Sequence, residues 1–215
     1  MFDVHDPNIQ NAIPNLSFDN FYTTNDILRE FLEKENINNE ELLIISPDMG
    51  AMERARYLAE ILKVDIGMFY KRRDVSKIID GKNPIVAHEY LGKDVENKDI
   101  IIVDDMIASG GSIIDVAREL KQRKARNIYA FATYALFTQG YELFDDAYLK
   151  GYITKIYTTN LSYIPDEIKN KEWINIVDLS EYAARIIDTL NKDESITELM
   201  TYTSARYNFS EQEVK

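Results

Sequence analysis

Cysteine is absent from this chain of 215 residues. Its absence excludes a disulfide, a thiolate nucleophile and a cysteine metal site, and it is typical of a reducing compartment. Long hydrophobic runs are missing too, because no stretch approaches the roughly 18 apolar residues of a membrane span. The first residues, MFDVHDPNIQ, lack the basic and apolar regions of a signal peptide. The sequence therefore predicts a soluble, cytoplasmic protein with no membrane partner.

Positive charge is scarce as well. Lysine and arginine total 25 against 37 aspartates and glutamates, which gives a formal net charge of -12. This charge repels the phosphate backbone of nucleic acids, so we do not expect a nucleic acid as the main partner. If the protein binds phosphate groups, it must do so through a local set of donors.

The chain does contain a regular alternation of two hydrophobic patterns. Short runs of β-forming residues bounded by polar or turn residues predict strands. They lie at 42–46, 65–70, 100–103, 127–136 and 155–159. Apolar residues at three- and four-residue spacing predict helices at 51–63, 141–151 and 180–190, and another helix that ends at Leu120. The order predicts an α/β fold with a mostly parallel, twisted sheet flanked by helices on both faces.

Three segments fall outside this alternation. Residues 71–98 are charged and offer only PIVAHEY as a strand, so we expect a protruding loop or ribbon there. Residues 1–20 have little periodicity, and we interpret them as the remnant of a missing N-terminal domain. The main domain would then cover 21–200, and the polar residues 201–215 would form a flexible tail.

The stretch VDDMIASGGS combines features of a ligand site. Asp104 and Asp105 follow a predicted strand, at the edge where open α/β sheets bind ligands. The turn that follows leads into a helix, whose first N–H groups are unpaired and favour an anion. Its residues are Ala108, Ser109, Gly110, Gly111 and Ser112. The serines add hydroxyl donors, and the glycines allow a close approach of the backbone.

A phosphorylated ribose satisfies both halves of this stretch. Its phosphate would lie in the turn, while the two carboxylates would accept hydrogen bonds from the sugar hydroxyls or hold Mg²⁺. The alternative is a strand-to-helix turn whose serine only caps the helix.

Five stretches together resemble the ribose-phosphate pyrophosphokinase family, which has a type I phosphoribosyltransferase fold. They appear in that family's order and span nearly the whole chain. They are DVHDPNIQ (3–10), ISPDMGAMERAR (45–56), YKRR (70–73), VDDMIASGGS (103–112) and ESITELM (194–200). The resemblance implies transfer of the diphosphate of ATP to the 1-hydroxyl of ribose 5-phosphate, which makes phosphoribosyl pyrophosphate.

The resemblance also implies roles for residues outside the acidic stretch. Lys71 would be the catalytic lysine, and Arg73 would meet the transferring phosphates or the ribose phosphate; the alternative is a solvated charge run. His5 would contact the Mg²⁺ bound to ATP through water or a phosphate. Asp48 would be a second magnesium-linked residue, unless it only caps a helix. Apart from the resemblance, the position of Arg54 and Arg56 on the following helix predicts salt bridges, with a regulatory phosphate contact as the alternative.

The chain departs from the family pattern in two places. Ala108 stands where the family loop usually has aspartate, which puts full turnover in doubt. The chain also corresponds to the C-terminal portion of the family, so we expect a homo-oligomer or a complex with an N-terminal half. A catalytically silent binding or regulatory subunit and a free-standing phosphoribosyltransferase are the alternatives.

Overall fold

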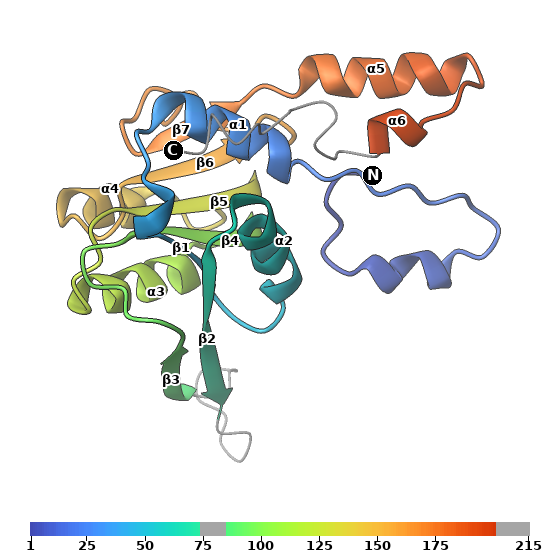
Figure 1. The fold of residues 1–215 in the computed structure, drawn as a ribbon. Helices are drawn as coiled ribbons and strands as arrows, with labels where there is room; N and C mark the ends of the chain where they lie inside the picture. Colours follow the sequence, from blue (N-terminus) through green and yellow to red (C-terminus); the bar gives the residue numbers. More distant parts are fainter. Residues whose placement is uncertain (74–84, 201–215) are drawn as a thin grey trace.

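A seven-stranded sheet in the order β3-β2-β1-β4-β5-β6-β7 forms the centre of the computed structural model (Figure 1). The strands are β1 (Leu42–Ser46), β2 (Asp65–Arg73), β3 (Ile85–Leu91), β4 (Asp99–Ile107), β5 (Ile128–Ala135), β6 (Lys155–Thr159) and β7 (Ile174–Val177). Only the β2–β3 pair is antiparallel among these strands. The predicted α/β fold with a mostly parallel sheet is confirmed.

The structure describes residues 1–73 and 85–200, without the side chains of Pro7, 71–73 and 85–88. The tail expected at 201–215 and residues 74–84 of the expected ribbon lie outside this part of the chain. No helix within it is long and apolar enough to cross a membrane.

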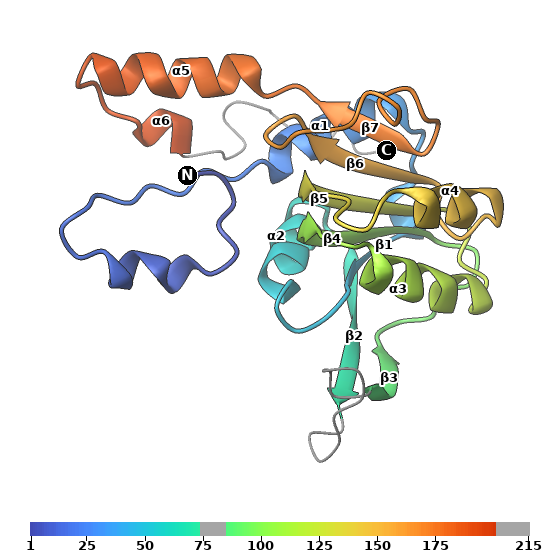
Figure 2. The same cartoon turned by 180° about the vertical axis from the view of Figure 1, so that it is seen from behind.

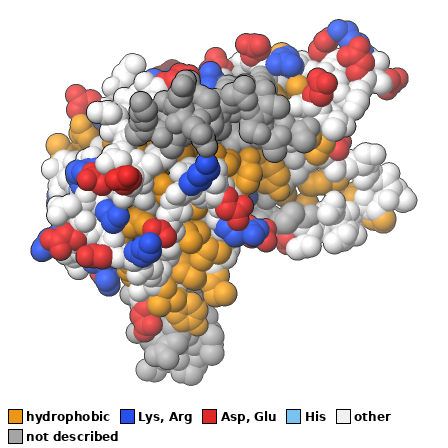
Figure 3. Space-filling view, viewed as in Figure 1, with side chains coloured by type: hydrophobic (Ala, Val, Ile, Leu, Met, Phe, Trp, Pro, Cys, Tyr) orange, Lys and Arg blue, Asp and Glu red, His pale blue; other side chains and the backbone are white. Residues whose placement is uncertain are grey.

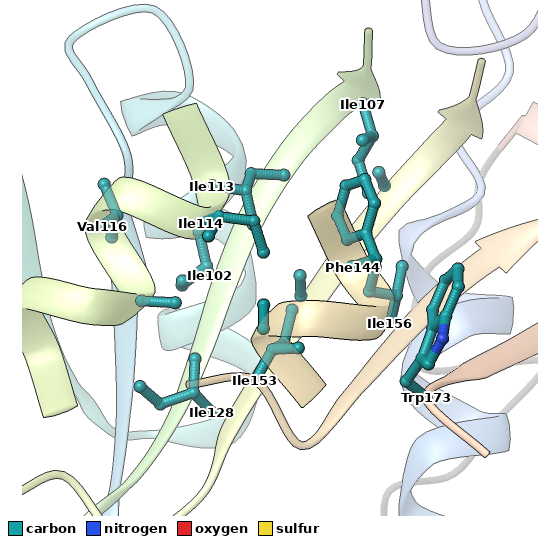
Figure 4. Close-up of a cluster of buried hydrophobic side chains, with 14 of the residues drawn as sticks. Ile102, Ile107, Ile113, Ile114, Val116, Ile128, Phe144, Ile153, Ile156 and Trp173 are labelled. Carbon is teal, nitrogen blue, oxygen red and sulfur yellow. The ribbon is translucent and has the colours of Figure 1, made fainter. Parts of the chain in front are cut away.

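Helices cover both faces of the sheet. The helices α1 (Thr24–Lys34) and α2 (Met52–Leu62) pack on one face, and α3 (Gly111–Gln122) and α4 (Glu142–Leu149) pack on the other. All five residues of β1 are buried, because successive side chains point to opposite faces and both faces are covered. Figure 4 shows the core on the α3–α4 side, to which β4 contributes Ile102, α3 contributes Ile113 and Ile114, and α4 contributes Phe144.

Two strands are longer than the sequence predicted. β2 continues through Arg73 because it pairs with β3, so the ribbon expected from residue 71 begins inside a strand, and the β2–β3 pair extends beyond the other strands (Figure 1). β4 runs to Ile107 rather than ending at Val103, because its last residues pair with Tyr134 and Ala135 of β5. Consequently the acidic pair lies within β4 rather than after it.

The N-terminal residues form a long loop at the carboxyl edge of the sheet. This loop contains the 3₁₀ helix η1 (Pro7–Ala12), and it lies at the same end of the molecule as α5 (Ser180–Asn191) and α6 (Thr197–Met200) (Figures 1 and 2). Phe2 pairs with Phe21 in an isolated bridge. Both rings pack with Tyr182 and Ile186 of α5, so the two ends of the loop are anchored. Whether the loop belongs to a further domain stays a prediction.

The strand order places a crevice between β1 and β4. After β1 the chain adds β2 on one side, and after β4 it adds β5 on the opposite side. The two loops therefore diverge at the carboxyl ends of β1 and β4, which is the position where open α/β sheets bind ligands.

Candidate active site

A cavity of about 500 Å³ lies at this crevice. Its walls come from the N-terminal loop, the β1–α2 connection, the end of β2 and the end of β4. The lining residues are His5, Asp48, Met49, Gly50, Ala51, Arg54, Tyr70, Asp104, Asp105 and Met106. The structure thus brings together four residues predicted for the site, namely both β4 carboxylates and the two predicted magnesium-linked residues.

The two adjacent carboxyl groups of β4 have different environments. Asp105 is 2% exposed, whereas Asp104 is partly exposed and accepts a hydrogen bond from the Asp105 backbone N–H at 2.9 Å. Burial, then the hydrogen bond and charge of Asp105, raise the pKa of Asp104 to about 7. Asp104 can therefore accept or donate a proton near neutral pH.

The second carboxylate, that of Asp105, forms a hydrogen bond with His5. Its Nδ1 lies 2.6 Å from Oδ2 of Asp105, although the His5 side chain is 74% exposed. Burial opposes ionisation of Asp105, but its hydrogen bonds with Asp104 and His5 and the charge of Arg54 outweigh this effect and lower its pKa. The hydrogen bond to Asp105 raises the pKa of His5 in turn. A ligand that used Asp105 would have to share it with His5 or displace His5.

Asp48 ties together the loop at the start of α2. Its Oδ1 accepts hydrogen bonds from the backbone N–H groups of Gly50 at 2.9 Å and Ala51 at 3.3 Å. This is the capping contact that the sequence allowed as an alternative. The same side chain still lines the cavity, so the cap does not remove it from the site.

The described side chains do not form a complete magnesium site. Within residues 1–73 and 85–200, no group of three or more histidines, aspartates or glutamates could hold a metal ion. Mg²⁺ commonly binds through one or two carboxylates together with water and substrate phosphates. Asp48 and Asp104 fit that arrangement because both present carboxylates to one cavity. His5 fits it poorly, since Nδ1 contacts Asp105 and imidazole is an unusual ligand for Mg²⁺.

The two glycines of the turn before α3 have different surroundings. Gly110 has a φ of +84°, and a Cβ there would lie 2.1 Å from Cζ of Phe144. A Cβ on Gly111 would meet only the Ser109 hydroxyl, at 3.9 Å. Gly110 therefore allows the turn to pack against α4, while Gly111 leaves open space at the start of the helix.

Within the described part of the chain, no side chain caps the first turn of α3. The N-cap residue is Gly110, and it makes no side-chain cap hydrogen bond. The serine cap proposed as the alternative interpretation is therefore not observed. Ala108 and Ser112 are exposed, so the first N–H groups of α3 lie beside accessible surface. The turn itself is not part of the cavity wall, although β4 leads directly from one to the other.

The predicted catalytic residues Lys71 and Arg73 lie near the end of β2. Their backbones pair with His88 and Ile85 of β3. Their side chains lie outside the described part of the structure, so their roles stay predictions. Tyr70, the residue before them, lines the cavity, which shows that β2 leads from the cavity into the ribbon.

Sequence reasoning missed the environment of Arg54 and the role of Asp3. The salt bridge expected for Arg54 is formed, with Nη2 lying 2.8 Å from Oδ1 of Asp3, but Arg54 also lines the cavity. The position of Arg54 in the first turns of α2, soon after Asp48, was the available signal. No local pattern could have identified its partner 51 residues away.

The fold and the site define an α/β domain with a cavity at the switch point of a mostly parallel sheet, and residues 19–165 match the phosphoribosyl transferase domain. The chain belongs to this family. It is homologous to ribose-phosphate pyrophosphokinases, with 30% identity over 199 residues to the protein of Mycoplasmopsis pulmonis (92% of this chain and 57% of that protein). The protein of Haemophilus ducreyi is 30% identical over 198 residues (91% and 58%).

A solved structure shows the same fold. Phosphoribosylpyrophosphate synthetase from Mycobacterium smegmatis matches with a TM-score of 0.68 and 20% identity, over 89% of this chain and 58% of that one. The chain therefore spans less than two thirds of the length of these relatives. The family resemblance inferred from the five motifs is confirmed.

Proposed function

We propose that the carboxyl-edge site binds ribose 5-phosphate and, together with an ATP-binding half, makes phosphoribosyl pyrophosphate. One observation supports this most. The acidic pair and the uncapped start of α3 lie at the two ends of one segment, residues 104–112, and this segment lies at the switch point of the sheet. The 5-phosphate would bind the first N–H groups of α3. The hydroxyls would then face Asp104.

In the proposed reaction the 1-hydroxyl oxygen attacks the β-phosphorus of ATP. A new P–O bond forms, the bond between the α-β bridging oxygen and the β-phosphorus breaks, AMP leaves and the hydroxyl proton is released. Positioning and charge neutralisation supply most of the catalysis in phosphoryl transfer. Asp104, with its pKa near neutrality, would accept hydrogen bonds from the sugar. Lys71 and Arg73 would balance the charge of the transferring group.

Mg²⁺, when bound, neutralises phosphate charge and orients the diphosphate. Asp48 and Asp104 are the residues that would hold it, with water and phosphate oxygens completing its shell. Asp48 would do so from the β1–α2 connection and Asp104 from the end of β4, since both line the same cavity.

The test is a titration of this chain with ribose 5-phosphate, followed by an assay of AMP formation. Binding of ribose 5-phosphate but not of ribose is expected, because the phosphate supplies the anion for α3. AMP formation is measured with this chain alone and with an added N-terminal half of a related enzyme. Activity that appears on complementation supports the proposal, whereas a failure to bind ribose 5-phosphate contradicts it.

A catalytically silent binding subunit is the second candidate. Two observations favour it: Ala108 stands where the family loop usually has aspartate, and His5 already occupies Asp105. If the chain binds ribose 5-phosphate but forms no AMP in either assay, the silent subunit is the better description.

A further inference from the structure

Asp3 holds Arg54 at the cavity. The guanidinium donates from Nε at 3.1 Å and from Nη2 at 2.8 Å, both to Oδ1 of Asp3. Nη2 also approaches the backbone oxygen of Val4 at 3.4 Å. A guanidinium with two donors on one carboxylate has a restricted orientation, unlike a solvated arginine.

Asp3 is itself fixed by the fold. Its Oδ2 accepts a hydrogen bond from the hydroxyl of Thr133 on β5, and this hydroxyl lies 2.6 Å from that of Thr23. The backbone N–H of Asp3 donates to the oxygen of Phe21 at 2.8 Å. Asp3 has a φ of 39°, in the left-handed region that few residues with a side chain adopt. Such backbone conformations persist where the surroundings determine them strongly, and they concentrate at functional sites.

Asp3 does not act on a ligand directly. It is 2% exposed, both of its carboxylate oxygens have protein partners, and it is not among the residues that line the cavity. Arg54, in contrast, lines the cavity beside Asp104 and Asp105. Among the described residues, none accepts a hydrogen bond from its Nη1.

We propose that Asp3 is a positioning residue that aims Arg54 into the cavity to bind a phosphate group of the second substrate. This inference rests on the proposed function, in which ribose 5-phosphate fills the α3 turn and Asp104 meets the sugar. The other charged residues that the structure describes in the cavity wall are acidic or only weakly basic, so Arg54 would add to the charge that Lys71 and Arg73 are proposed to supply for the diphosphate. Arg54 is the strong cation that the described residues place there.

The experiment measures inorganic pyrophosphate binding by calorimetry, in a magnesium buffer saturated with ribose 5-phosphate. Ribose 5-phosphate occupies the turn first, so pyrophosphate reports on the rest of the cavity. Asp3→Asn keeps the shape and tolerates the left-handed backbone, but it removes the charge that holds Arg54. We expect it to weaken pyrophosphate binding about tenfold and to change ribose 5-phosphate binding less than about twofold.

Asp99→Asn is the matched control. Asp99 is also 2% exposed and binds an arginine through two donors, but it lies at the opposite edge of the sheet. It should lower the melting temperature as Asp3→Asn does, yet leave pyrophosphate binding unchanged. If only Asp3→Asn weakens pyrophosphate binding, a lower melting temperature cannot by itself explain the loss of binding.

A double-mutant cycle tests whether Asp3 acts through Arg54. Arg54→Lys should weaken pyrophosphate binding about tenfold in the natural chain but far less in Asp3→Asn, because the lost contacts are shared. Two additive losses would overturn the positioning role, as would unchanged pyrophosphate binding in Asp3→Asn. Absence of pyrophosphate binding to a chain that still binds ribose 5-phosphate would overturn this inference alone. Absence of ribose 5-phosphate binding would overturn the proposed function first.

Discussion

At the amino edge of the sheet the acids Asp99 and Glu35 have cation or hydroxyl partners, whereas at the carboxyl edge two acids lie side by side on β4. Oδ2 of Asp99 lies 2.6 Å from Nη2 of Arg126. Glu35 accepts hydrogen bonds from Lys155 at 2.9 Å and from Tyr157 at 2.6 Å. Burial opposes ionisation of Glu35, but these hydrogen bonds outweigh it and lower its pKa. The amino edge is thus organised for stability.

At the carboxyl edge, the folded chain retains a carboxyl group whose ionisation is unfavourable. Burial and the neighbouring Asp105 raise the pKa of Asp104 to about 7, so its charged form is disfavoured in the folded chain. Sites of this kind are retained where a ligand or a proton transfer needs them. The difference between the edges indicates the carboxyl edge as the candidate site without reference to any relative. On the face shown in Figure 3, basic and acidic side chains lie intermingled, and apolar side chains gather over β2.

The largest effect is expected at a glycine of the carboxyl edge and would show that this edge also contains residues essential for folding. Gly110→Ala forces a Cβ into Phe144 at a φ of +84°, which should lower the free energy of unfolding by about 3 kcal/mol. Urea denaturation measures this. Gly111→Ala is the control, because its Cβ meets open space; it should preserve stability but weaken ribose 5-phosphate binding. Equal destabilisation by both changes would contradict the distinction.

The second prediction concerns the removal of one carboxylate charge at each edge. Asp99→Asn should destabilise the chain by about 2 kcal/mol, because it weakens the two charge-assisted hydrogen bonds that Arg126 donates to a buried carboxylate. Asp104→Asn should stabilise it by about 1 kcal/mol above pH 7, after a discount for partial exposure. A raised carboxyl pKa reduces stability above the unfolded value near 4, so the gain should shrink as the pH falls toward 4.

Urea midpoints at pH 8 and pH 4.5 measure both variants. A loss of stability in Asp104→Asn at pH 8 would mean that the charge of Asp104 is stabilised by partners, as the charges of the acids at the amino edge are. The comparison of the two edges would then no longer locate the site.

The smallest effect is expected for His5. Because its contact with Asp105 raises the pKa of His5, the contact stabilises the fold below the unfolded histidine pKa of about 6.5 and loses this effect as the pH rises through the higher folded value. His5→Ala should therefore lower the melting temperature slightly at pH 5.5 and leave it unchanged at pH 9. The loss stays below about 1 kcal/mol because the imidazole is 74% exposed. A large loss at both pH values would show that the N-terminal loop is anchored by more than this pair.

Local patterns predicted much of the fold. The buried runs at 42–46 and 155–159 are strands, and the spacing of Ala55, Leu58, Ala59 and Leu62 marks the buried face of α2. They did not predict α1 or β7, and they ended β4 too early. Strand pairing extended β4 through the acidic pair, because Met106 and Ile107 complete the ladder with β5. Pairing with a neighbour is a tertiary property that a window of sequence does not contain.

The sequence by itself determined the alternation of strands and helices, the absence of cysteine chemistry and the segment at 104–112 that joins two acids to a glycine turn. Hydrophobic periodicity and turn chemistry act over a few residues, so they can be read directly. Only the tertiary structure brought His5 to Asp105, 100 residues away, and Asp3 to Arg54, 51 residues away. These contacts depend on how the N-terminal loop packs at the carboxyl edge, and no local spacing encodes that packing.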